Sequence, residues 1–152
     1  MQAGFIGLGT MGASMAANLQ TGLKARGDTL VVHDIRRDAA SRHVRDGAVW
    51  ADTPQAVAEQ SEVIFTSLPG PPEFEAVAAG LLAGIRKGTA YFDLTTNSPT
   101  VVRKAHEAFA AMLAPMVPRP MNPACMTRSC YGLASNTSRA MFAALIAAGQ
   151  PA

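Results

Sequence analysis

A glycine motif close to the N-terminus places the strongest constraint on the fold of this chain. The motif follows directly on the short apolar segment 3–6. Behind it, apolar residues recur at helical spacing as far as Leu19, and Gly22 is expected to end that helix. A strand that passes through glycines straight into a helix predicts a βαβ unit. The residues of this GxGxxG motif are Gly7, Leu8, Gly9, Thr10, Met11 and Gly12.

Each glycine of the motif has its own physical role. Gly7 allows a tight turn, the missing side chain of Gly9 lets a pyrophosphate approach the backbone, and Gly12 lets the helix pack closely on the strand. The N-terminus of the helix then offers free N–H groups and the positive end of its dipole to phosphate. The motif predicts a dinucleotide site, and a plain glycine-rich turn is the alternative.

An acidic residue follows the motif at the distance that a dinucleotide site requires. Asp34 lies 22 residues after Gly12, at the end of the β-branched segment 30–33. A carboxylate there accepts from ribose hydroxyls and repels a 2′-phosphate, which favours NAD. Arg36 and Arg37 leave NADP open, unless they are only exposed loop residues. Domains that bind S-adenosylmethionine also combine a glycine loop with such an acid, but the third glycine favours a dinucleotide.

Short apolar segments alternate with helical patterns along the first two thirds of the chain. Strands that are apolar on both faces indicate a parallel sheet covered by helices on both sides. Right-handed crossovers then make a doubly wound α/β domain the expected fold. The expected strands are 3–6, 30–33, 47–50, 63–68 and 90–94, and the later helices are 38–46, 54–60, 73–82 and 98–111.

Composition excludes several other classes of protein. The chain has 152 residues, 49% of them apolar, so one domain with a sizeable core is expected. A net charge of +2 favours neither nucleic acid nor a polybasic membrane contact. No segment resembles a signal peptide or a membrane span. Cys125 and Cys130 alone make neither a disulfide framework nor a metal site, so a cytoplasmic protein without a metal is expected.

The last part of the chain differs in composition from the body. All 11 acidic residues lie at or before Glu107, and the 45 residues that follow hold none. Methionines and prolines crowd the same region. We therefore expect a dinucleotide-binding body over 1–114 and an irregular tail over 115–152. The tail is either read out of frame or a diverged natural segment with a short helix over 138–148.

Three motifs in order resemble the β-hydroxyacid dehydrogenases, a family related to 6-phosphogluconate dehydrogenase. The segment GFIGLGTMG at residues 4–12 resembles the N-terminal signature of this family. Ser67-Leu68-Pro69 resembles the next cofactor contact, and the segment DLTTNSP at residues 93–99 resembles the Asp-x-Ser-Thr segment. The resemblance covers residues 3 to about 113. It implies a Rossmann-type domain that binds NAD, or NADP.

The resemblance also implies a role for each matched position. Residues 7–12 would hold the pyrophosphate and Asp34 the adenosine ribose, while Thr96 would lie near the nicotinamide. An arginine close to the ribose, such as Arg36, would influence the choice between NAD and NADP. The other residues expected to line the cofactor cleft are Leu68, Pro69 and Glu73.

The chain departs from the family pattern after its last helical segment. The family's next motif, Asp-Ala-Pro-Val-Ser-Gly-Gly, which helps hold the substrate carboxylate, is not matched at residues 113–117. The helical domain that carries the family's catalytic lysine and dimer surface is expected to be absent. Lys24, Lys87 and Lys104 match no catalytic position. The expected function is the cofactor-binding domain of an oxidoreductase that transfers hydride between NAD(P) and a small β-hydroxy acid or its semialdehyde. Alone, this chain is expected to be inactive or severely impaired in that reaction.

The alternatives to an enzyme domain are a non-catalytic nucleotide-binding module and an inert fragment. No residue of the chain is expected to act as a catalyst by itself, and a hydroxy-acid substrate is expected only for a full-length form. Of the three histidines, His33 is expected to approach the adenine, whereas His43 and His106 are expected on the surface.

Overall fold

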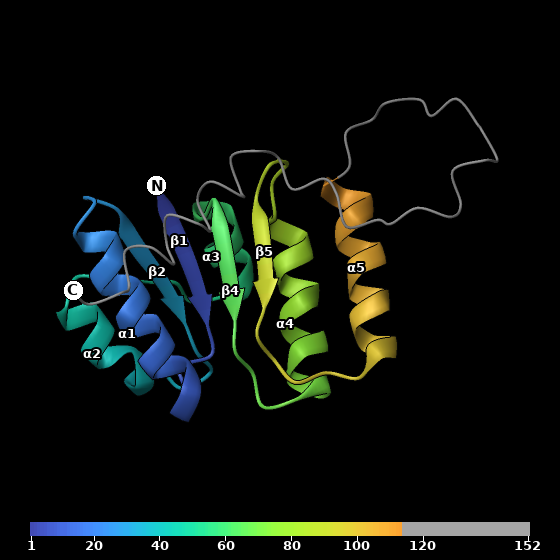
Figure 1. The fold of residues 1–152 in the computed structure, drawn as a ribbon, viewed down its shortest axis with the longest axis horizontal. Coiled ribbons are helices and arrows are strands. Elements are labelled where there is room, and N and C mark those ends of the chain that lie inside the picture. Colours follow the sequence, from blue (N-terminus) through green and yellow to red (C-terminus); the bar gives the residue numbers. More distant parts are fainter. Residues whose placement is uncertain (114–152) are drawn as a thin grey trace, which may run out of the picture. The chain divides into compact units, whose positions relative to one another are not determined.

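Five parallel strands form the centre of the domain in this computed structural model, which describes residues 1–113 (Figure 1). Their order in the sheet is β3-β2-β1-β4-β5, so the chain starts near the middle and builds outward on both sides. The predicted doubly wound parallel sheet is confirmed. The tail predicted for 115–152 lies outside the described residues. The strands are β1 (Gln2–Ile6), β2 (Thr29–His33), β3 (Val49–Trp50), β4 (Val63–Thr66) and β5 (Ala90–Asp93).

Helices cover both faces of the sheet. Helices α1 and α2 pack on one face, and α3, α4 and α5 pack on the other. Among the helices of residues 1–113, none combines the length and the apolar character that crossing a membrane requires. The helical elements are α1 (Thr10–Lys24), the 3-10 turn η1 (Arg37–Ala40), α2 (Ser41–Arg45), α3 (Pro54–Gln60), α4 (Pro71–Gly84) and α5 (Pro99–Leu113).

Neighbouring residues of β1 pack into two separate apolar cores, one on each face of the sheet. Phe5 packs with Leu23 of α1 on one face, whereas Ile6 packs with Ile64 and Leu81 on the other. All five residues are at most 1% exposed. Successive residues of a strand point to opposite faces, so a strand inside a two-sided core must be apolar throughout. Each such side chain contributes about 1.5–3 kcal/mol when it leaves water.

The prediction that Gly22 ends helix α1 is wrong, because the helix continues to Lys24. Gly22 takes a helical conformation, and the turn that ends the helix is made by Gly27, whose φ is +73°. There the amide of Asp28 donates to the carbonyl of Leu23 at 2.9 Å. A glycine ends a helix where the backbone must take a positive φ, and Gly22 keeps a negative, helical φ.

His43 is buried, which contradicts the prediction that it lies on the surface. Only 2% of the residue is exposed. Gln20 of α1 donates from Nε2 to the carbonyl oxygen of His43 at 2.9 Å, and its Oε1 lies 3.3 Å from Nδ1 of the ring. Burial lowers the pKa of His43, and the positive charge of Arg42 lowers it further. The ring belongs to the packing between α1 and α2.

Helices α3 and α4 begin at residues that favour helix starts. Thr53 caps α3, since its Oγ1 accepts from the amide of Ala56 at 3.1 Å, and Pro54 takes the first helical position. Helix α4 starts at Pro71, two residues before the predicted position, because proline is tolerated in a first turn. Its Gly84 lies against α3, where an added Cβ would approach the carbonyl oxygen of Gln55 to 2.5 Å.

Candidate cofactor site

The carboxyl ends of β1 and β4 meet where the order of the strands reverses. The chain leaves β1 toward β2 through α1 on one face, and leaves β4 toward β5 through α4 on the other. The amide of Ser67, just after β4, donates to the carbonyl of Ile6 at 2.9 Å and holds the two strand ends together. Such a reversal opens a crevice at the carboxyl edge, which is where doubly wound sheets bind their ligands.

Steric constraints require glycine at two positions of the GxGxxG loop. Gly7 has φ +95°, and a Cβ there would collide with the carbonyl oxygen of Ser67. A Cβ at Gly12 would collide with the carbonyl oxygen of Gly7. The chain therefore needs Gly7 for the turn and Gly12 for the close approach of α1 to β1, as the sequence predicted.

Gly9 differs from the other two glycines because the protein itself leaves space around it. A Cβ at Gly9 would meet no atom within 4 Å. Gly9 is the N-cap of α1, and no side chain caps the helix there. Thr10 and Met11 of the first turn are exposed, and the turn holds no acidic residue. These features suit the binding of a pyrophosphate at the N-terminus of α1. That residues 7–12 bind a pyrophosphate stays a prediction.

Asp34 lies beside the glycine loop, as the spacing of the sequence requires. Its Oδ2 accepts from the amide of Leu8 at 2.6 Å, and its Oδ1 accepts from the amide of Arg36 at 2.8 Å. The half-buried carboxylate is therefore fixed at the end of β2. Each oxygen keeps a free acceptor position, which is what recognition of two ribose hydroxyls needs.

The two arginines after Asp34 differ in their surroundings. The guanidinium of Arg37 lies over the ring of Trp50, 5.6 Å from its centroid, in a cation–π contact. The ring of His33 lies 5.5 Å from that of Trp50, and its Nδ1 is bonded to the carbonyl of Ala51 at 2.9 Å. Arg36 is exposed and is the arginine that stays available to a ligand beside Asp34.

The predicted residues after β4 divide into two groups. Leu68 is half-buried, and its Cδ2 would lie 3.1 Å from a Cβ at Gly7, so the structure brings it to the glycine loop. Pro69 and Glu73 are exposed, the latter in the first turn of α4. Their contact with a cofactor stays a prediction.

The structure adds Thr95 and Asp93 to the candidate site, which the sequence analysis did not predict. Thr95 Oγ1 accepts from the amide of Leu68 at 3.0 Å, and the amide of Thr95 donates to Asp93 Oδ1 at 3.1 Å. Thr96, the predicted residue, is exposed beside them. The segment DLTTNSP at residues 93–99 carried the signal, but two adjacent threonines cannot be told apart without the structure.

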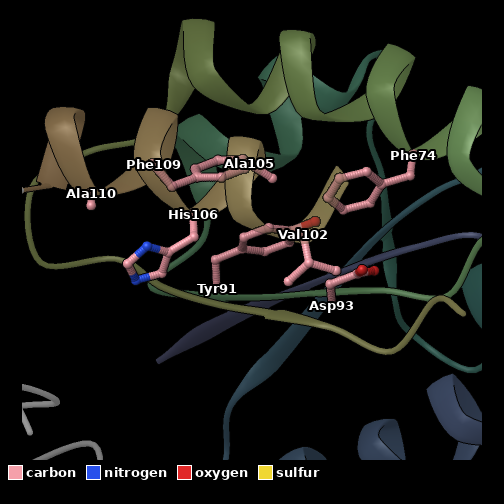
Figure 2. Close-up of a pocket in the computed structure, with 8 residues that line it drawn as sticks. All are labelled: Phe74, Tyr91, Asp93, Val102, Ala105, His106, Phe109 and Ala110. Atoms are coloured by element: carbon pink, nitrogen blue, oxygen red, sulfur yellow. The ribbon is translucent and has the colours of Figure 1, made fainter. Parts of the chain in front are cut away.

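A pocket of about 390 Å³ lies between β5 and the helices α4 and α5 (Figure 2). The ring of Tyr91 packs against that of Phe109 there, with centroids 4.6 Å apart, and burial raises the pKa of the Tyr91 hydroxyl. The pocket contains none of the predicted cofactor residues. It is lined by Phe74, Tyr91, Asp93, Val102, Ala105, His106, Phe109 and Ala110.

Known proteins share this combination of sheet, glycine loop and acid. The sequence model of the NAD binding domain of 6-phosphogluconate dehydrogenase matches residues 2–122. The chain therefore belongs to this family of NAD(P)-binding domains, and within it to the domains of β-hydroxyacid dehydrogenases such as 3-hydroxyisobutyrate dehydrogenase. The match ends beyond residue 113, where the resemblance was expected to stop. The alternative of an S-adenosylmethionine-binding domain is wrong.

Three similar proteins illustrate the relationship. The chain is 39% identical over 110 residues to the NAD-dependent L-serine dehydrogenase of Pseudomonas aeruginosa, covering 70% of this chain and 36% of the relative. The Mycobacterium tuberculosis 3-hydroxyisobutyrate dehydrogenase with L-serine matches with a TM-score of 0.64 and 28% identity, over 73% of this chain and 37% of that one. Psf3 in complex with NADP+ and 2-OPP matches with a TM-score of 0.62 and 34% identity, over 72% of this chain and 39% of that one. The chain thus spans about a third of its relatives' length.

Proposed function

We propose that this chain binds NAD(P)H across the carboxyl edge of its sheet. The adenosine would lie at the end of β2, the pyrophosphate on the loop after β1, and the nicotinamide at the ends of β4 and β5. The observation that carries this proposal is the hydrogen bond between Asp34 and the amide of Leu8. It sets the ribose acceptor beside the phosphate loop, so one dinucleotide can reach both.

NAD is the proposed preferred cofactor. A carboxylate at Asp34 binds ribose hydroxyls and repels the dianion of a 2′-phosphate. Arg36 lies two residues further on and lessens that repulsion, which makes the preference modest. The relatives support both cofactors, since one is named as NAD-dependent and another was solved with NADP+.

The proposed reaction of the complete protein is hydride transfer between the nicotinamide and a small β-hydroxy acid or its semialdehyde. Similarity to a serine dehydrogenase and to 3-hydroxyisobutyrate dehydrogenase supports this substrate class. The described residues serve the cofactor. Lys24 and Lys87 precede β2 and β5 at the opposite edge of the sheet, and Lys104 faces solvent on α5. Proton transfer to the substrate would therefore depend on residues outside 1–113.

Calorimetry on the 152-residue chain tests cofactor binding. NADH is expected to bind with one site and to bind more tightly than NADPH, whereas S-adenosylmethionine should not bind. A folded sample that binds neither NADH nor NADPH up to the order of 1 mM would show that the proposal is wrong.

Assays of NADH formation with L-serine and with 3-hydroxyisobutyrate test the reaction. This chain alone is expected to show binding without turnover. Turnover by the chain itself would contradict the proposed division of labour, in which residues 1–113 serve the cofactor.

A further inference from the structure

A chain of hydrogen bonds joins the ends of β4 and β5 at the carboxyl edge. Thr66 Oγ1 donates to Asp93 Oδ1 at 2.8 Å, and the hydroxyl of Tyr91 lies 3.0 Å from the same Thr66 oxygen. Thr66 gives its single hydroxyl proton to Asp93, so the Tyr91 hydroxyl is the donor in its bond with Thr66. Asp93 therefore receives a bond from inside the sheet.

Asp93 also organises the loop that follows β5. Its Oδ1 accepts from the amide of Thr95 at 3.1 Å, and its Oδ2 accepts from Nδ2 of Asn97 at 2.8 Å. Three donors on one half-buried carboxylate fix the direction of the loop. Oδ1 of Asn97 is buried and has no partner among the described residues, so Asp93 holds the Asn97 amide by its donor side alone.

Thr95 extends this network to the loop after β4. Its Oγ1 accepts from the amide of Leu68 at 3.0 Å across 27 residues of sequence. Leu68 in turn packs against Gly7 of the glycine loop. The Asp93–Thr95–Leu68 chain therefore connects the loop after β5 to the loop after β4 and, through it, to the loop after β1.

We propose that Asp93 and Thr95 are positioning residues that set the shape of the nicotinamide half of the cofactor cleft. This inference rests on the proposed function. The strand order places β2 and Asp34 on one side of β1, and β4 and β5 on the other. A dinucleotide with its adenosine at β2 must place its nicotinamide beside the loops that Thr95 joins. Disturbing this bridge should therefore affect only one half of the ligand.

The test compares NADH with ADP-ribose, which lacks the nicotinamide, on variants of the full chain. Thr95→Val removes the hydroxyl and keeps the shape, whereas Thr95→Ser keeps the hydroxyl. Thr21→Val is the matched control, because it makes the same change at an exposed threonine of α1 whose hydroxyl donates only to the carbonyl of Ala17. Thr95→Val is expected to weaken NADH about fivefold and to change ADP-ribose less than about twofold. Thr95→Ser and Thr21→Val should stay within about twofold of the wild type for both ligands.

The inference is overturned if Thr95→Val loses affinity equally for NADH and ADP-ribose, or loses none. It is also overturned if Thr95→Ser loses as much NADH affinity as Thr95→Val. If the circular dichroism of Thr95→Val shows that this variant is unfolded, Asp93→Asn becomes the deciding variant. It must then show the same selective loss of NADH affinity. A wild type that binds neither ligand would overturn the proposed function itself. If the wild type binds both ligands but Thr95→Val shows no selective loss of NADH affinity, only the inference about Asp93 and Thr95 fails and the proposed function stands.

Discussion

The carboxylate of Asp34 accepts a hydrogen bond of 2.6 Å from the amide of Leu8, which ties the end of β2 to the glycine loop after β1. The two residues are 26 positions apart, and the parallel pairing of Ile6 with His33 brings them together. One carboxylate thus supports the loop and faces the proposed ribose. Changes at Asp34 should therefore affect both the choice of cofactor and the order of the loop.

Replacing Asp34 by Asn should move the cofactor preference toward NADP. The amide side chain keeps one oxygen for the loop, loses one ribose acceptor and no longer repels the 2′-phosphate. We expect the ratio of NADPH to NADH affinity to rise about tenfold, measured by calorimetry. Arg36→Ala is the matched control and should lower NADPH affinity alone. A wild type that already prefers NADPH would mean that Arg36, and not Asp34, sets the choice.

Valine at Gly9 should abolish tight cofactor binding while the domain remains folded. A side chain at Gly9 meets no protein atom within 4 Å, but it fills the space proposed for the pyrophosphate. NADH affinity should fall by at least about tenfold, with an unchanged thermal midpoint. Alanine at Gly12 is the counterpart, because its Cβ collides with the Gly7 carbonyl; it should cost about 1–3 kcal/mol of unfolding free energy. Similar destabilisation by both changes would refute this distinction.

Two other glycines should respond to alanine with opposite signs. Gly22 lies inside α1 with no neighbour within 4 Å of an added Cβ, so Gly22→Ala should stabilise the protein by about 0.5–1 kcal/mol. Gly84 packs against α3, where the Cβ would meet the Gln55 carbonyl at 2.5 Å, so Gly84→Ala should destabilise by about 1–3 kcal/mol. Urea unfolding measures both. A loss of stability in Gly22→Ala would contradict the helical environment seen there.

Acidification should destabilise the domain through His43. Burial lowers the pKa of His43 in the folded state below its usual value of 6.5, so the unfolded state binds more protons between the two values. The unfolding free energy should therefore fall as the pH drops from about 7 to about 5. His43→Gln should reduce this slope, whereas a change at the exposed His106 should keep it. An equal slope in His43→Gln and wild type would assign the effect to other groups.

The sheet and the glycine loop could be predicted because their sequence signals are local. The turn at Gly7, the two-sided apolar strands and the start of α3 at Pro54 each follow from a few adjacent residues. The position of Asp34 followed from the length of one βαβ unit. Such signals depend on backbone geometry and hydrophobic period, which the chain carries segment by segment.

The errors arose where distant residues decide the environment. His43 lies among Arg42, Arg45 and Asp46, which suggest solvent, but Gln20 of α1 covers it. Thr95 and Thr96 are equivalent by sequence, and only the pairing of β4 with β5 turns Thr95 toward Leu68. Tertiary contacts of this kind have no period and no motif, so the structure was needed to find them.

The most direct test of the central claim is an amide NMR titration of the 152-residue chain with NADH. We expect shifts at the carboxyl edge of the sheet, at residues 7–12, at Arg36 and at Thr95–Thr96. The amides of Lys24 and Lys87 at the opposite edge should not move. Shifts confined to other surfaces, or none in a folded sample at millimolar NADH, would contradict a cofactor site built on the Asp34 and Leu8 contact.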